Sequence, residues 1–125
     1  MKSRAYDQEP GKRPDPYSKA VTNLSKEQEK RVAKKMGGRR QPASGALPGI
    51  PNDVSTDEFL VECKRTKYSG MGIKGDWIER LDEVAIMHGK IPCIELEFDG
   101  LPDGVTKHWM MIPFDVFCER MTGNK

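Results

Sequence analysis

The run of residues 59–64 constrains the fold most, because it places charged side chains at the end of an otherwise apolar strand. Side chains alternate along a strand, so Glu62 and Lys64 are expected to share one face. Asp53 precedes Glu62 by nine positions, before a turn at residues 55–58, and a hairpin would bring the two acids alongside each other. Two carboxylates and an ammonium at the end of a buried strand are costly unless they bind something.

Paired carboxylates favour a hard divalent cation. Magnesium takes one or two carboxylates together with waters and the phosphate oxygens of a substrate. Lys64 is then placed to hold or deprotonate a water, or to stabilise negative charge on a phosphate. The alternative is a simple ion pair between Glu62 and Lys64 on an exposed strand edge.

The order Asp, variable gap, Glu-x-Lys resembles the motif of the PD-(D/E)XK nuclease superfamily. Residues 37–46, Gly-Gly-Arg-Arg-Gln-Pro-Ala-Ser-Gly-Ala, resemble the Ser-Gly loop of archaeal-type Holliday junction resolvases and their phage relatives. Those proteins also carry a Glu on the first helix, followed by apolar residues three and seven positions later. Glu29 meets that pattern with Val32 and Met36.

This resemblance covers roughly residues 25–98 and departs from the family at Pro51-Asn52-Asp53, where the usual pair is Pro-Asp. It implies a small restriction-endonuclease-like α/β core, a central mixed β-sheet flanked by helices in the order α-β-β-α-β-β-α. It also implies phosphodiester hydrolysis with one or two Mg²⁺ ions per site, for which Mn²⁺ can substitute. The implied catalytic residues are Glu29, Asp53, Glu62 and Lys64, and the implied metal ligands are Glu29, Asp53, Glu62 and the backbone carbonyl of Cys63.

The charge distribution favours DNA as a partner. The net charge is only +2, yet residues 26–40 carry seven basic side chains against two acidic ones. A basic helix beside a carboxylate cluster suits a phosphate backbone, since bound metal ions reverse the sign of the acidic part. A solvated helix face is the alternative for such a charge run. The predicted DNA contacts are Lys30, Lys34, Arg39, Arg40, Ser44, Gly45 and Lys67.

Resolvases of this type act as homodimers on four-way junctions. The resemblance therefore implies a homodimeric, structure-selective endonuclease of DNA recombination, most simply a phage Holliday junction resolvase. Three alternatives stay open: another PD-(D/E)XK nuclease (nickase, restriction-type enzyme or exonuclease), a non-catalytic DNA-binding module on the same fold, and a regulatory protein that presents the basic helix to RNA. No run approaches membrane-spanning length and no signal peptide is visible, so we expect a cytoplasmic location, host cytoplasm for a phage protein.

Local patterns predict a flexible polar arm over residues 1–23 and a nuclease domain over residues 24–125. Ser25 is predicted to cap a helix from Lys26 to Met36 that ends at Gly37-Gly38. Asp76 is predicted to cap a second helix, which Gly89 ends and whose apolar face is formed by Trp77, Leu81, Val84 and Ala85. The remaining predicted elements are strands near 52–54, 59–64, 91–98 and 105–112, and a last helix opened by Pro113.

The same patterns predict which side chains are buried. Glu95 and Glu97 are expected to alternate outward from their strand. His88 and His108 have no carboxylate close in sequence and are predicted to be surface or strand-end residues. The residues predicted to lie in the core include Cys63, Trp77, Cys93, Trp109, Phe114, Phe117 and Met121.

Overall fold

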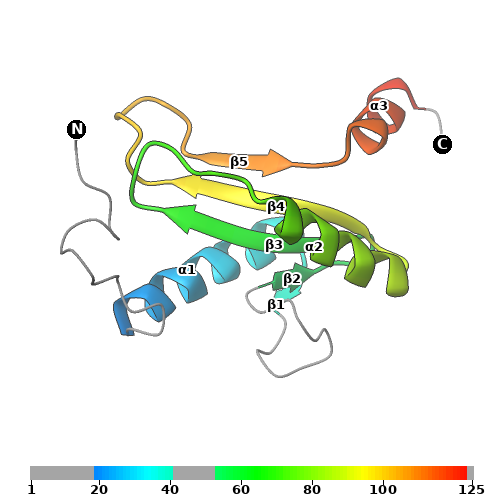
Figure 1. Ribbon diagram of the computed structural model, residues 1–125, viewed down its shortest axis with the longest axis horizontal. Coiled ribbons are helices and arrows are strands. Elements are labelled where there is room, and N and C mark those ends of the chain that lie inside the picture. Colours follow the sequence, from blue (N-terminus) through cyan, green and yellow to red (C-terminus); the bar gives the residue numbers. More distant parts are fainter. Residues whose placement is uncertain (1–18, 41–52, 124–125) are drawn as a thin grey trace.

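The computed structural model describes residues 19–40 and 53–123, with side chains from Leu24 and from Val54 onward. Within these ranges the chain is an α/β protein, in which a five-stranded mixed sheet is accompanied by three helices (Figure 1). The strands lie in chain order across the sheet; β3 and β4 are parallel, and the other neighbours are antiparallel. The elements are α1 (Lys19–Met36), β1 (Arg39–Arg40), β2 (Asp53–Ser55), β3 (Phe59–Thr66), α2 (Gly75–Met87), β4 (Ile91–Phe98), β5 (His108–Met111) and α3 (Phe114–Thr122).

A helix covers each face of the sheet, and the alternation of side chains along β3 separates two cores. Leu60 packs with Leu81 and Ala85 of α2, on what we call the α2 face. Val61 packs with Val32 of α1, on the opposite α1 face. The predicted α/β class with a mixed sheet and flanking helices is therefore confirmed, with α1 and α2 on opposite sides of β3 and β4 (Figure 1).

The helix α2 forms the crossover that parallel strands require. Its predicted apolar face is confirmed, since Leu81 and Ala85 are buried. The predicted cap is wrong: Lys74 is the N-cap and Asp76 lies in the first turn, because Gly75 already has helical geometry. In the first turn of this helix, the Trp77 amide donates a hydrogen bond to the Lys74 carbonyl at 3.1 Å.

The first helix begins earlier than predicted, at Lys19 rather than Lys26. No glycine or proline interrupts residues 19–36, so nothing in the chain stops the helix from extending upstream. Ser25 consequently lies inside α1, and the prediction that it caps the helix is wrong. The predicted end is confirmed: Gly37 has φ 70°, and the Gly38 amide donates to the Ala33 carbonyl at 2.8 Å.

Directly after this helix end, β1 pairs with β2, with Arg39 opposite Ser55 and Arg40 opposite Val54. The predicted element order omitted this strand, and the observed order is α-β-β-β-α-β-β-α. The close approach at Gly38 explains the pairing, because a Cβ there would lie 2.7 Å from the Ser55 carbonyl oxygen. Glycine therefore lets the chain turn tightly from α1 onto the edge of the sheet.

The strand β4 has the predicted bounds, but β5 is shorter than predicted, at His108–Met111 rather than 105–112. The turn before it persists to Lys107, whose carbonyl accepts from the Phe98 amide at 2.9 Å. Val105 belongs to this turn and donates its amide to the Pro102 carbonyl at 3.2 Å. Trp109, predicted to be core, is 54% exposed because β5 is the edge strand.

The last helix, α3, forms after Pro113 as predicted, but its apolar side chains do not point inward. Phe114, Phe117 and Met121 are 76%, 48% and 66% exposed, because α3 lies beyond the end of β5, clear of both faces of the sheet (Figure 1). Arg120 links α3 to the rest of the fold, since its Nη2 lies 2.7 Å from Glu58 Oε2.

Among the described residues, no helix is both long and apolar enough to span a membrane.

The turn between β4 and β5 lies tightly against the segment that follows β3. A Cβ added at Gly100 would lie 2.4 Å from the Tyr68 carbonyl carbon and 2.7 Å from the Ser69 amide nitrogen. Gly100→Ala is expected to lower the free energy of unfolding by about 1–3 kcal/mol, measured by urea unfolding, because backbone rather than a flexible side chain must move. Gly72→Ala is the control, since a Cβ there meets nothing within 4 Å. Equal losses in both variants would contradict the close approach.

Candidate active site

The charged end of β3 has the arrangement that alternation predicts. Glu62 and Lys64 lie on the same face of the sheet, with Lys64 Nζ 2.9 Å from Glu62 Oε2. Asp53 on β2 is directly opposite Glu62 in the antiparallel register, so the predicted hairpin is confirmed for the backbone. The side chain of Asp53 lies outside the described part of the chain. The structure therefore joins Glu62 to Lys64 by contact, and Asp53 to Glu62 by register.

One oxygen of Glu62 has no partner in the part of the chain that the structure describes. The residue is 3% exposed, and its Oε1 is buried without a hydrogen bond from any described group. A buried, unsatisfied polar atom costs about 1–3 kcal/mol, and a charged one costs more. A plain ion pair with Lys64 accounts for Oε2 but leaves Oε1 unexplained. A divalent cation is a partner of the right charge and chemistry for a carboxylate oxygen at this position.

Lys64 has a second partner that the sequence did not indicate. Its Nζ lies over the ring of Trp77, 4.1 Å from the ring centroid. Trp77 was predicted to be core; it is half-buried, on the first turn of α2, and contacts a charged group. Because Trp77 and Lys64 belong to different elements, no local pattern could have paired them.

Gln28 of α1 is 2% exposed and bridges three elements. Its Nε2 donates to the Lys64 carbonyl at 2.9 Å and to Glu95 Oε1 at 2.7 Å. The first of these bonds fastens α1 to β3 one residue beyond Cys63, whose carbonyl is a predicted metal ligand. Gln28 therefore stabilises the backbone of β3 at the candidate site.

Glu29 is buried, at 3% exposure, on the same side of α1 as Val32, so the helical phase predicted for it is correct. Its Oε1 accepts a hydrogen bond from Arg40 Nε at 3.1 Å. Burial raises the pKa of Glu29 above its usual value, and Arg40 opposes that effect. The helix carrying Glu29 packs on the α1 face, whereas Glu62 and Lys64 lie on the α2 face, and among the described residues the contact of Glu29 is with Arg40.

The predicted DNA contacts are distributed over several elements. Lys30 and Lys34 are exposed on α1 and one helical turn apart, so both can reach the same phosphate backbone. Arg39 and Lys67 are also exposed. Arg40 is partly engaged by Glu29. Ser44 and Gly45 lie outside the described residues.

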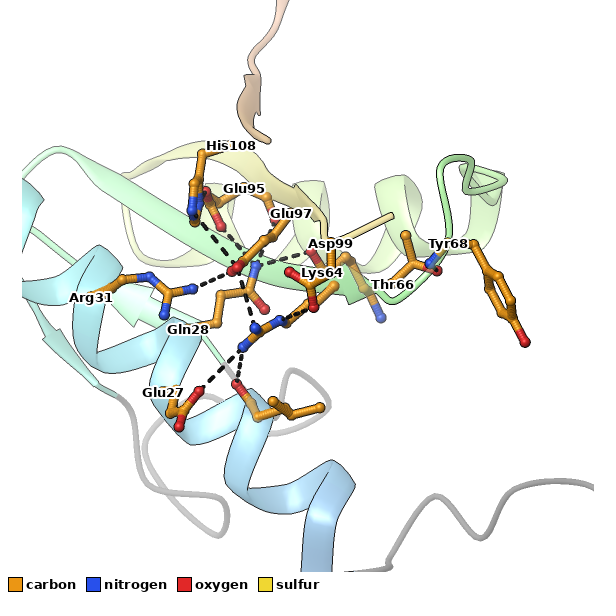
Figure 2. A network of polar contacts seen from close by, with 12 residues as sticks. Glu27, Gln28, Arg31, Lys64, Thr66, Tyr68, Glu95, Glu97, Asp99 and His108 are labelled. Carbon is orange, nitrogen blue, oxygen red and sulfur yellow. Dashed lines mark hydrogen bonds and ion pairs between the residues drawn. The ribbon is translucent and has the colours of Figure 1, made fainter. Parts of the chain in front are cut away.

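A second polar cluster lies on the α1 face, where the sequence predicted solvent. Glu95 and Glu97 are 7% and 5% exposed rather than pointing outward, because α1 covers this face of β4. Figure 2 shows the carboxylates of β4 meeting side chains from α1 and β5. Arg31 bonds Glu97, and His108 Nδ1 lies 3.1 Å from Glu95 Oε2. His108 is thus a partner of buried acids and not simply a strand-end residue.

Arg65 completes this cluster from β3. Its guanidinium lies 3.4 Å from Glu97 Oε2 and 2.8 Å from Asp99 Oδ2. Burial raises the pKa of Glu97, and the charges of Arg65 and Arg31 oppose the rise. We call Gln28, Arg31, Arg65, Glu95, Glu97, Asp99 and His108 the β4 polar network.

Three members of the network also have the spacing of a metal site. One ligand atom from each of Glu95, Glu97 and His108 lies within 4.8 Å of the others. Both carboxylates already have protein partners, however, and Glu97 contacts two guanidinium groups. A cation here would compete with those positive charges, whereas Glu62 Oε1 has no described partner to displace. The end of β3 is therefore the better candidate for metal binding.

The predicted burial of Cys63 and Cys93 is confirmed, at 7% and 2% exposure. Burial raises the pKa of the Cys93 thiol to about 12, so it stays protonated at neutral pH and is a poor nucleophile or ligand.

Comparisons with family models, with curated proteins and with solved structures find no match. Function is therefore inferred from the geometry of these residues.

Proposed function

We propose that this chain is a Mg²⁺-dependent DNA endonuclease of the PD-(D/E)XK type, and that its substrate is branched DNA, as for a Holliday junction resolvase. The observation that carries the proposal is the buried Oε1 of Glu62, which has no partner among the described residues, beside Lys64 and opposite Asp53 in the sheet. Two acids and a lysine at one sheet position suit phosphodiester hydrolysis. An exposed structural ion pair would not need a buried, unsatisfied oxygen.

In this proposal Glu62 and Asp53 hold the ion, with the Cys63 carbonyl as a further ligand. When bound there, Mg²⁺ would supply a water of lowered pKa and would polarise the scissile phosphate. Lys64 stabilises negative charge as it develops on the phosphate, or orients the attacking water. Glu29 is left out of this ligand set, because α1 holds it on the opposite face of the sheet from Glu62 and its Oε1 accepts from Arg40.

Two surfaces support DNA as the substrate and a second copy as the partner. The exposed Lys30 and Lys34 of α1 offer positive charge to a phosphate backbone. On α3, Phe114, Phe117 and Met121 are exposed at helical spacing, which is typical of a surface that packs against another chain. A homodimer would carry two sites, as cutting opposed strands of a junction requires. The proposed compartment is the cytoplasm, that of the host for a phage protein.

Cleavage of a labelled four-way junction, with a linear duplex of the same sequence alongside, tests the proposal. In Mg²⁺ the full chain is expected to cut the junction at least about tenfold faster than the duplex, and a chelator should stop both reactions. Equal rates on the two substrates would keep the nuclease and reject the resolvase. Tight binding without cutting in Mg²⁺ or Mn²⁺ would support the non-catalytic DNA-binding module instead.

A further inference from the structure

The ammonium of Lys64 is held by two groups from different elements. Glu62 Oε2 lies 2.9 Å away on β3, and the Trp77 ring centroid lies 4.1 Å away on α2. A cation over an indole face is attracted by the ring quadrupole, and tryptophan gives the strongest contact of the aromatic side chains. Leu81, one turn along α2 from Trp77, is 2% exposed, so the helix that carries the indole is anchored in the core.

The indole differs from the carboxylate in how it would respond to a bound metal ion. Once Glu62 ligates a cation, its negative charge is shared between that cation and Lys64, and its hold on the ammonium weakens. The Trp77 ring carries no net charge and has no lone pair for a metal, so its attraction for Lys64 is unaffected. The flexible lysine stem then depends on the ring to keep the ammonium near the site.

We propose that Trp77 is a positioning residue for Lys64, holding its ammonium beside Glu62 while the metal and the phosphate are bound. This inference rests on the proposed nuclease function. It assigns the first turn of α2 a part in catalysis through Lys64, without contact between Trp77 and the reacting atoms. The aromatic face is the essential property, and not the volume of the side chain.

Two substitutions separate those properties. Trp77→Leu keeps an apolar side chain without a ring, and Trp77→Tyr keeps an aromatic face. At saturating enzyme, single-turnover cleavage of the junction is expected to be about tenfold slower in Trp77→Leu and within about threefold of wild type in Trp77→Tyr. The dissociation constant for DNA, measured in Ca²⁺, should stay unchanged in both variants. Equal slowing in the two variants, or no slowing in Trp77→Leu, would overturn the proposal.

A second measurement needs no enzymatic activity. The ε-methylene protons of Lys64, assigned by their loss from the spectrum of Lys64→Arg, should be shifted upfield by the indole ring current. This shift is expected to disappear in Trp77→Leu and to persist, reduced, in Trp77→Tyr. An unchanged shift in Trp77→Leu would overturn the contact itself. Were wild type to show the shift but cleave no DNA, the proposed function would fail while the contact stood, so the two failures are distinguishable.

Discussion

Glu62→Gln is expected to reduce Mg²⁺-dependent DNA cleavage by about 10³-fold or more, because the neutral amide is a poor ligand for a hard cation. The Oε1 atom of Glu62 has no described protein partner, and the Gln amide oxygen can still accept from Lys64, so the loss should come mainly from the metal. Single-turnover cleavage of the junction measures the effect. Glu58→Gln is the matched control, since Glu58 is an exposed acid just before β3 and should tolerate the change.

The thermal stability of the same variants separates catalysis from folding. Mg²⁺ is expected to raise the melting temperature of wild type and of Glu58→Gln, but not that of Glu62→Gln, because an ion that binds the folded state stabilises it. Without metal, Glu62→Gln should fold with a stability close to that of wild type, because removing a buried carboxylate with an unsatisfied oxygen offsets the weaker contact with Lys64. Undiminished cleavage by Glu62→Gln would remove the candidate site from consideration. Loss of folding would show that Glu62 is structural.

The second large effect concerns stability. Arg65→Met is expected to lower the free energy of unfolding at pH 7 by about 3 kcal/mol, because it removes one of the two guanidinium groups at buried Glu97 and the partner of Asp99. The Arg65 side chain is 17% exposed, and its Nε bonds Asp99 Oδ2. Its other guanidinium nitrogens lie within 3.5 Å of carboxylate oxygens of Glu97 and Glu27. Urea unfolding measures the loss. Arg120→Met is the control: its partner Glu58 is well exposed, so the loss should stay below about 1 kcal/mol.

The pH dependence of that loss identifies its cause. Burial raises the pKa of Glu97 above the usual 4.5, so Glu97 favours the folded state most below pH 4.5 and loses that contribution as pH rises through the folded pKa. Removing Arg65 takes away a cation that lowers this pKa, so the destabilisation by Arg65→Met should be smaller at pH 4 than at pH 7. Adding Glu97→Gln should recover part of the loss at pH 7. A loss that is independent of pH and of Glu97 would point to packing alone.

Local sequence patterns were sufficient for the core of the candidate site. Strand alternation correctly placed Glu62 and Lys64 on one face. The short spacing between Asp53 and Glu62 correctly predicted the hairpin that sets these two residues opposite each other. Helical phase correctly predicted that Glu29 is buried. It could not predict the partner of Glu29, because Arg40 reaches it from a strand formed by a tight turn at Gly37-Gly38.

Local patterns were also sufficient for the bounds of β4, the apolar face of α2 and the end of α1, since these follow from periodicity and from glycine conformation. Which faces of the sheet are covered depends on how the helices pack. Glu95 and Glu97 alternate as solvent-facing residues do, yet they are buried because α1 packs over them and supplies Arg31. The apolar residues of α3 have a core-like spacing, yet the helix lies away from both faces of the sheet. Burial and charge pairing depend on contacts between residues far apart in the chain. A local sequence pattern cannot predict such contacts.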